Sequence, residues 1–130
     1  MIDSPKVLRD YIAGEASVTA LTSTRIYSEV SYPRPGYSPN DDGSCLVFRR
    51  RGGTVFYSAK LMLESYMFKH YAIDEDNANT LYRAVFDILH DHRGEGIASA
   101  KLEISGQTLT DMDTGWPHVL CFYNVMFRMI

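Results

Sequence analysis

The segment "DEDNANTLYRAVFDILHDHRGEG" (residues 74–96) carries the clearest structural pattern in the chain. Apolar side chains recur in it at intervals of three and four residues: Ala78, Leu81, Tyr82, Val85, Ile88 and Leu89. This spacing is typical of one face of an amphipathic helix. Asp74 stands where a capping residue is needed, acidic residues follow it, and His90, His92 and Arg93 stand at the other end, as the helix dipole prefers. The segment therefore predicts a long helix over about residues 75–92.

Strand-like segments lie on both sides of this helix. Residues 61–71 and 118–130 are rich in aromatic and aliphatic side chains and predict two long strands. The segment "ASAKLEIS" (residues 98–105) alternates, and the pattern places on one side Ala98, Ala100, Leu102 and Ile104. Residues 25–30 predict a further, short strand. Ser4 and Pro5 predict the start of an N-terminal helix over residues 5–13, with the serine hydroxyl as its cap.

These elements predict an α+β fold in a single domain of residues 1–130. A small antiparallel or mixed β-sheet packs against one long amphipathic helix, about 75–92, plus a short N-terminal helix. The last strand is apolar on both faces, since Leu120, Phe122 and Met126 alternate with a second apolar set. The long helix covers only one face of the sheet. The other face is covered either by the N-terminal helix and the proline-rich segment or by neighbouring subunits.

Composition excludes several classes of function. The net charge is −3 and the pI is near 5.7, which disfavours nucleic acid as the main partner. Neither an N-terminal export signal nor a run of about 18 apolar residues is present, so we expect a soluble, unexported protein without a membrane partner. Cys45 and Cys121 lie in strand-like runs and are expected to be buried, reduced thiols rather than a disulfide.

The stretch "CLVFRRRGGTVFY" (residues 45–57) predicts two short strands, 45–48 and 54–57, joined by a hairpin connection at residues 49–53. Arg49, Arg50 and Arg51 would then form a basic hairpin tip. Three readings stay open: solvated charge, docking on an acidic surface of a protein partner, or binding of nucleic acid. A phosphate cradle is excluded, because such a loop opens a helix and this one leads into a strand.

The stretch "YPRPGYSPNDDG" (residues 32–43) holds three of the five prolines. Its composition predicts neither a helix nor a central strand. Long loops inside a small domain are usually functional or disordered. We expect contacts with a protein partner from five of its side chains: Tyr32, Arg34, Tyr37, Asp41 and Asp42.

No pattern of side chains indicates catalysis, a metal or a cofactor. "HDHR" (residues 90–93) lacks further ligands at metal-binding spacing, and "DEDNAN" (residues 74–79) lacks the later residues of a calcium loop. Glu64 and Glu103 could meet across strands, but nothing marks them as an acid–base pair. The sequence contains no known local signature of a nucleophile. We therefore expect a protein that is not an enzyme.

Three quoted segments carry a resemblance that runs along most of the chain. They are "VTALTSTRIYSEVSYP" (residues 18–33), "MFKHYA" (67–72) leading into "ANTLYRAVFDIL" (78–89), and "DTGWPHVLCFYNVMF" (113–127). In order and residue type the chain resembles the tail-completion, or tail-terminator, proteins of long-tailed bacteriophages with non-contractile tails. The arginine stretch and the length of the proline-rich loop have no counterpart in that family's pattern.

The resemblance implies a structural virion protein of the tail or neck, assembled in the host cytoplasm. Such a protein forms a ring, in this family a hexamer, that ends polymerisation of the tail tube and joins the tail to the head connector. Its partners would be further copies of itself, the tail tube protein and a head-closure protein. Arg49, Arg50 and Arg51 could also face the lumen and touch passing DNA without sequence preference. The alternatives are a head-closure or other minor tail protein and, from another class, a small nucleic-acid-binding regulator.

Overall fold

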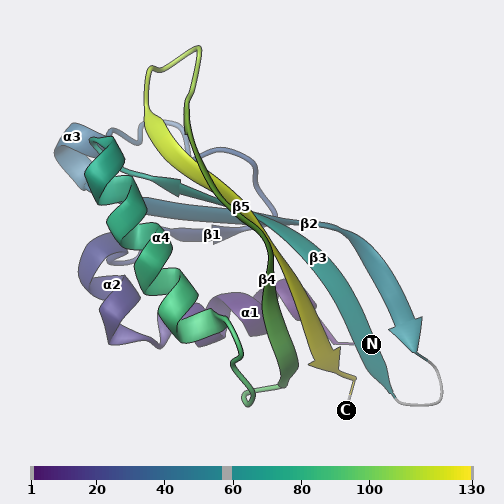
Figure 1. Cartoon of the computed structure of the whole chain (residues 1–130). Helices are drawn as coiled ribbons and strands as arrows, with labels where there is room; N and C mark the ends of the chain where they lie inside the picture. Colours follow the sequence, from purple (N-terminus) through teal and green to yellow (C-terminus); the bar gives the residue numbers. More distant parts are fainter. Residues whose placement is uncertain (1, 57–59, 130) are drawn as a thin grey trace.

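A computed structural model of the chain describes residues 2–56 and 60–129. Its centre is a five-stranded sheet in the order β1-β2-β3-β5-β4 (Figure 1). The strands are β1 (Ile26–Ser28), β2 (Cys45–Phe56), β3 (Leu61–Tyr71), β4 (Ile97–Thr110) and β5 (Pro117–Arg128). β1 runs parallel to β2, and the other neighbours are antiparallel. The predicted α+β fold with a small mixed sheet is confirmed.

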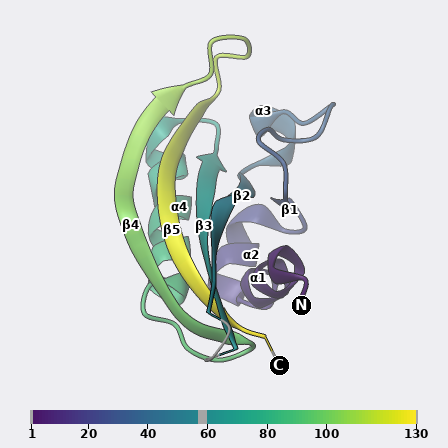
Figure 2. The same ribbon diagram turned by 90° about the vertical axis from the view of Figure 1, so that its right-hand side faces the viewer.

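Three helices contribute to one core with the same face of this sheet (Figures 1 and 2). They are α1 (Ser4–Ala13), α2 (Ala16–Thr22) and α4 (Glu75–Leu89), and one further turn, α3 (Pro39–Asp42), lies in the proline-rich segment. The Asp74 cap is confirmed, since its carboxylate accepts a hydrogen bond from Asn77 N at 2.8 Å. α4 ends at Leu89, earlier than predicted, because His90 takes an extended backbone conformation. α2 was not predicted. The prediction that residues 32–43 contain no helix is wrong, because Pro39 stands at the start of the short α3, where proline is tolerated.

The N-terminal helix is capped by a different residue from the one predicted. The Asp3 carboxylate accepts a hydrogen bond from Lys6 N at 3.3 Å, and Ser4 lies inside the first turn. The buried Ser4 hydroxyl donates instead to the Glu64 carboxylate on β3. Ser4 therefore attaches α1 to the sheet rather than capping the helix.

The predicted hairpin at residues 49–53 is wrong, because β2 runs without interruption from Cys45 to Phe56. A bulge lies at Arg51, just before the two glycines, because the register with β3 shifts between Arg50 and Gly52. Gly52 has a φ of +109°, and a Cβ on Gly53 would lie 1.9 Å from the carbonyl oxygen of Leu63. Glycine at position 52 thus suits the backbone of the bulge, and glycine at position 53 suits the close approach of β3. The connection to β3 lies after residue 56, and Tyr57, placed in the predicted strand, is outside the described residues.

The helices cover one face of the sheet but not the other. On β5, alternate side chains are buried in the core with the helices: Val119, Cys121, Tyr123, Val125 and Phe127. The side chains between them lie on the opposite face, which we call the open face. By strand register it carries these residues: Arg49, Thr54, Leu63, Ser65, Met67, Ile104, Phe122, Asn124 and Met126.

The proline-rich segment covers only one end of the open face. Tyr37 packs there in a small cluster with Cys45, Val47 and Tyr71, against which Trp116 also lies. The N-terminal helix does not contribute, since α1 belongs to the core on the other face. The rest of the open face has no cover from the described part of the chain.

Both cysteines are free and buried, as predicted. Cys45 lies on β2 in the cluster under the proline-rich segment, while Cys121 lies on β5 in the main core. β3 separates the two strands, and the residues pair with Tyr71 and Phe68 of β3, which places them at least about 10 Å apart, too far for a disulfide. Burial raises the pKa of the Cys45 thiol to about 12 and also raises the pKa of Cys121.

Candidate interaction surface

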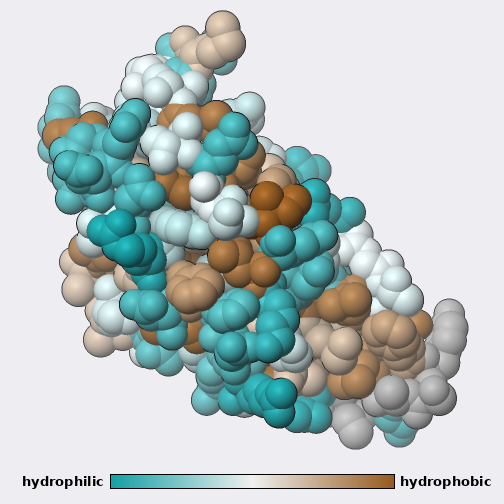
Figure 3. Space-filling model, in the orientation of Figure 1, coloured by the Kyte–Doolittle hydropathy of each residue, from teal (hydrophilic) through white to brown (hydrophobic). Residues whose placement is uncertain are grey.

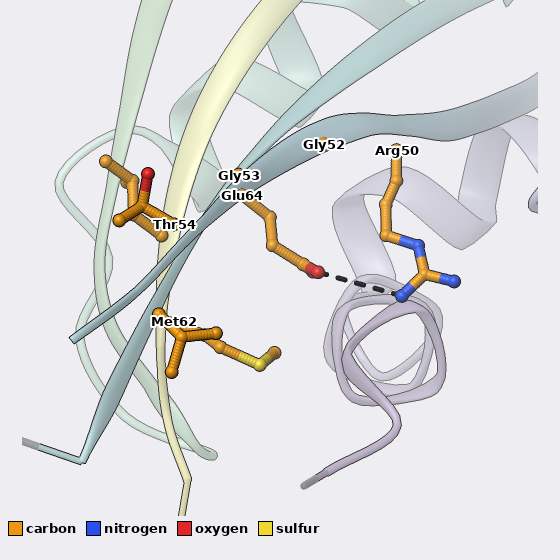
Figure 4. Close-up of a pocket in the computed structure, with 8 residues that line it drawn as sticks. Arg50, Gly52, Gly53, Thr54, Met62 and Glu64 are labelled. Atoms are coloured by element: carbon orange, nitrogen blue, oxygen red, sulfur yellow. Dashed lines mark ion pairs between the residues drawn. The ribbon is translucent and has the colours of Figure 1, made fainter. Parts of the chain in front are cut away.

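The three consecutive arginines do not form one basic patch. In the strand, Arg50 points to the helix-covered side, where its Nε lies 3.3 Å from Glu29 Oε2 and its Nη1 lies 3.6 Å from Glu64 Oε2 (Figure 4). Its backbone N also donates to Glu29 Oε1 at 3.1 Å. Arg49 lies on the opposite, open face. The expected hairpin tip with three free arginines is therefore replaced by a strand that presents them to two different environments.

Glu64 is the centre of a polar cluster between β3 and α1. Its carboxylate accepts hydrogen bonds from the Ser4 hydroxyl and, at 2.9 Å, from the Tyr66 hydroxyl, besides its ion pair with Arg50. Burial raises the pKa of Tyr66, which keeps this hydroxyl protonated as a donor. A cavity of about 300 Å³ beside the cluster is lined by Thr54 and other residues of the two strands (Figure 4). The two charged side chains that line this cavity, Arg50 and Glu64, are paired with each other.

Arg51 lies across the open face and contacts each of the other three long strands. Its guanidinium donates to the Ser65 hydroxyl on β3, at 3.1 Å from Nε and 2.8 Å from Nη2. Its Cζ lies 4.0 Å from the ring centre of Phe122 on β5, a cation–π contact. Its Nη2 also lies 3.2 Å from Glu103 Oε2 on β4. Arg51 therefore covers part of an apolar surface while staying exposed.

Unlike Arg50 and Arg51, Arg49 has no carboxylate partner in the described part of the chain. Its Nη1 donates to the Ser31 hydroxyl at 3.2 Å, and within residues 2–56 and 60–129 no carboxylate lies within 4 Å of its side chain. Glu64 and Glu103, which the sequence allowed as a pair, lie on opposite faces and cannot act together. These two carboxylates therefore do not form an acid–base pair.

In the proline-rich segment, some of the predicted contact residues are exposed. Tyr32 is 62% exposed, and the Lys69 ammonium lies 4.4 Å from its ring centre. Burial lowers the pKa of Lys69, whose Nζ also donates to Ser31 O at 3.1 Å. The guanidinium carbon of Arg34 lies 4.7 Å from the ring centre of Tyr27. These cation–π contacts hold the loop on the sheet and leave Tyr32 accessible.

Tyr37 has a different role from its neighbours in the loop. It is 8% exposed, its hydroxyl donates to Gly43 O at 2.5 Å, and its ring meets Trp116 edge to face at 5.2 Å. Its ring fills the small cluster under the loop and is therefore not accessible at the surface. Asp41 and Asp42 are exposed on α3, and Ser38 N donates to an oxygen of Asp42 at 2.9 Å.

The alternation of residues 98–105 predicts that Ile104 lies on the same side of the strand as Ala100 and Leu102, and this is wrong. Ala100 and Leu102 pair with core-facing residues of β5, but the register shifts after Leu102 and Ile104 pairs with Phe122. Ile104 therefore lies on the open face and is 50% exposed. The bulge that turns it has no strong signal in the sequence, where the alternation continues.

The described part of the chain holds neither a metal-ligand cluster nor a helix that could span a membrane. Within residues 2–56 and 60–129, no group of three or more His, Cys, Asp or Glu side chains could hold a metal ion. Over the same residues, no helix has the length and apolar character needed to cross a membrane. The distinctive surfaces are the open face, with its mixture of apolar and basic side chains, and the loops at one end of the sheet.

Comparison with known proteins identifies a solved structure with a similar fold. No protein-family model matches the sequence. The curated proteins contain no match to it. Among solved structures, the fold is similar to a chain of the virion of a native gene transfer agent (GTA) particle, with a TM-score of 0.66. The superposition covers 93% of this chain and 90% of that chain at 12% sequence identity, so the two share an architecture over nearly their whole length.

Proposed function

We propose that this chain is a structural virion protein, a tail terminator that forms a ring at the head-proximal end of a tail tube. The observation that carries the proposal is the fold shared with a chain of a gene transfer agent virion over 93% of the sequence. The resemblance of residues 18–33, 67–89 and 113–127 to tail-completion proteins supports it independently. In this role the protein ends tube polymerisation and provides the surface that joins the tail to the head.

The surface of the sheet supports assembly rather than catalysis. An apolar face without cover is stabilised when another protein surface removes it from water. Met67, Phe122 and Met126 are half-buried on the open face, and Ile104 is exposed beside them. A ring subunit buries such surface between protomers or against the next ring. Arg50 and Arg51 are held by carboxylates of the same chain, which argues against a regulator that binds nucleic acid through these arginines.

The test is particle assembly without this protein. In an assembly reaction or host that lacks it, we expect tail tubes of irregular, excessive length that do not join heads, as seen by negative-stain microscopy. Adding back the purified protein should restore tails of one length attached to heads. Tails of normal length that fail to join heads would instead indicate a head-closure protein. Normal tails joined to heads would contradict the proposal.

A double variant tests whether the open face is needed for particle assembly. Arg49→Ser with Arg51→Ser removes two charges from the open face and leaves Arg50 with Glu64. We expect this variant to fold, as judged by circular dichroism, but to restore tails poorly. Arg83→Ser with Arg93→Ser on the helical side is the matched control and should restore them fully. If both variants restored tails equally well, the two open-face arginines would not be needed for assembly.

A further inference from the structure

The exposed large apolar side chains fall into two groups with opposite electrostatic surroundings. Phe56 is 40% exposed and Ile104 is 50% exposed, and both lie on the sheet among basic residues of the open face. Figure 3 shows apolar patches over the strands with hydrophilic surface between them. By strand register, the basic side chains of that face include Arg49, Arg51 and Arg128, besides Lys69, which contacts Tyr32, and Lys101, which pairs with Asp91; its carboxylates include Glu103. Glu103 is already paired with Arg51.

The second group lies at one end of the sheet, which we call the acidic end. It comprises α3, the first turn of α4 and the turn between β4 and β5, which protrudes at the top of Figure 1. A cavity lined by Asn40, Ile73 and Trp116 shows that the three segments adjoin. Its carboxylates belong to these residues: Asp41, Asp42, Asp74, Glu75, Asp76, Asp111 and Asp113.

The acidic end also exposes apolar side chains. Met112 is 99% exposed at the tip of the turn between β4 and β5, between Asp111 and Asp113, and Ile73 is 51% exposed beside the first turn of α4. Tyr32 of the proline-rich loop is 62% exposed near the same turn, with which it shares a cavity. Arg34 lines the same cavity. Each of the two surfaces thus combines apolar anchors with an excess of one sign of charge.

We propose that the open face of one copy of this chain binds the acidic end of a second copy, with Met112 as the apolar anchor. The complementary charges are the reason for naming a second copy as the occupant: both halves of the interface are present on one chain, at different places. Such a head-to-tail contact is heterologous, and repeated contacts of this kind close into a ring or extend as a filament. The inference rests on the proposed ring and identifies the surfaces that build it.

The individual contacts follow from the chemistry of the two surfaces. Arg49 has no carboxylate partner in the described part of its own chain and is available to pair with Asp111 or Asp113 of the next copy. The flexible Met112 side chain suits an irregular apolar surface such as that between Phe122, Met126 and Ile104. Since the interface combines apolar burial with exposed charge pairs, salt should weaken the association without abolishing it.

Two charge-reversed variants test the pairing. One is Arg49→Glu with Arg128→Glu on the open face; the other is Asp41→Lys with Asp113→Lys at the acidic end. None of these four side chains forms an ion pair within residues 2–56 and 60–129, so the fold should persist, as checked by circular dichroism. Light scattering after size exclusion measures the mass of each protein over a range of concentrations.

We expect the wild-type chain to associate and each reversed variant to need at least tenfold higher concentration to reach the same mass. An equimolar mixture of the two variants should associate as the wild type does, because each reversed surface then faces a reversed partner. Met112→Ser should weaken association without changing its salt dependence. Arg83→Glu with Arg93→Glu, an equal change of charge on the helical side, is the control and should associate normally.

Two results would overturn the inference. In one, each reversed variant alone reaches the same mass at the same concentration as the wild type, so that the contact lies elsewhere on the chain; the assembly test of the proposed function is unaffected by this result. In the other, the wild type stays monomeric at every concentration, so that the two surfaces do not bind each other. Failure of the proposed function would appear separately, as normal tails and heads in the absence of the protein.

Discussion

The two faces of the sheet carry similar apolar side chains but have different neighbours. On β5, Phe127 faces the helices and is fully buried, whereas Phe122 on the same strand lies under the Arg51 guanidinium on the open face. One face is closed by three helices of the same chain. The other is closed only at one end, by the proline-rich segment. Apolar alternation in a sequence therefore shows which residues avoid water but does not identify what covers them.

The largest expected effect separates these two phenylalanines. Phe127→Ala removes a ring from a dry core that includes Tyr66, and we expect the free energy of unfolding to fall by about 3–5 kcal/mol. Phe122→Ala should cost less than half of that, because its ring keeps contact with solvent. Urea denaturation followed by circular dichroism measures both. Equal losses would mean that the open face is as well packed as the helix-covered face.

Acid should weaken the helix-covered side through His70. This side chain is fully buried, its Nδ1 donates to Val119 O at 2.8 Å, and burial lowers its pKa to about 4. The unfolded chain takes up a proton near pH 6.5, while the folded chain resists it until about pH 4. The free energy of unfolding should therefore fall by about 3 kcal/mol as the pH drops from 6.5 to 4.

The variant His70→Asn isolates this contribution. Its amide can still donate to Val119 O but has no proton to gain in this range, so stability at neutral pH should fall while its slope between pH 6.5 and 4 becomes flatter. Some slope remains from His118, whose pKa is also lowered by burial. Thermal melts at several pH values give both slopes. An unchanged slope in the variant would assign the acid sensitivity to other groups.

The bulge in β2 provides the next test. Gly53→Ala places a Cβ against the carbonyl oxygen of Leu63, so β2 must move away from β3, at an expected cost of about 1–3 kcal/mol. Gly36→Ala is the comparison, because Gly36 has a φ of +87° but no atom within 4 Å of the added carbon. It should lose only about 1 kcal/mol from backbone strain. A smaller loss for Gly53→Ala than for Gly36→Ala in urea denaturation would contradict the requirement for a close approach.

Local signals account for what the sequence predicted correctly. The strand Leu61–Tyr71 and the Asp74 cap follow from alternation, spacing and capping chemistry, which act within a few residues. The hairpin at residues 49–53 failed because Gly-Gly between two β-rich runs suits a turn or a bulge equally well. The close approach of Gly53 to Leu63 favours the bulge, and this contact between strands cannot be read from either segment alone.

The candidate surface was predictable only in part for the same reason. The sequence identified the three arginines and the proline-rich loop, but it could not show that Arg50 and Arg51 point to opposite faces with different carboxylates. Ile104 was misplaced by a register shift, which the alternating sequence does not reveal. α2 was missed because "ASVTALT" has no side-chain cap and few strong helix formers. Tertiary contacts decide each of these features.

The smallest expected effect compares the neighbouring arginines. Arg50→Met leaves the Glu64 carboxylate, whose side chain is 13% exposed, without a cation, and we expect a loss of about 1 kcal/mol. Arg51→Met removes an exposed pair with Glu103 but places another apolar side chain beside Phe122, so the change should stay within about 0.5 kcal/mol. Urea denaturation at low and high salt measures both. If Arg51→Met were the more destabilising change, the open face would contribute to folding of the single chain, and its availability for a second copy would be in question.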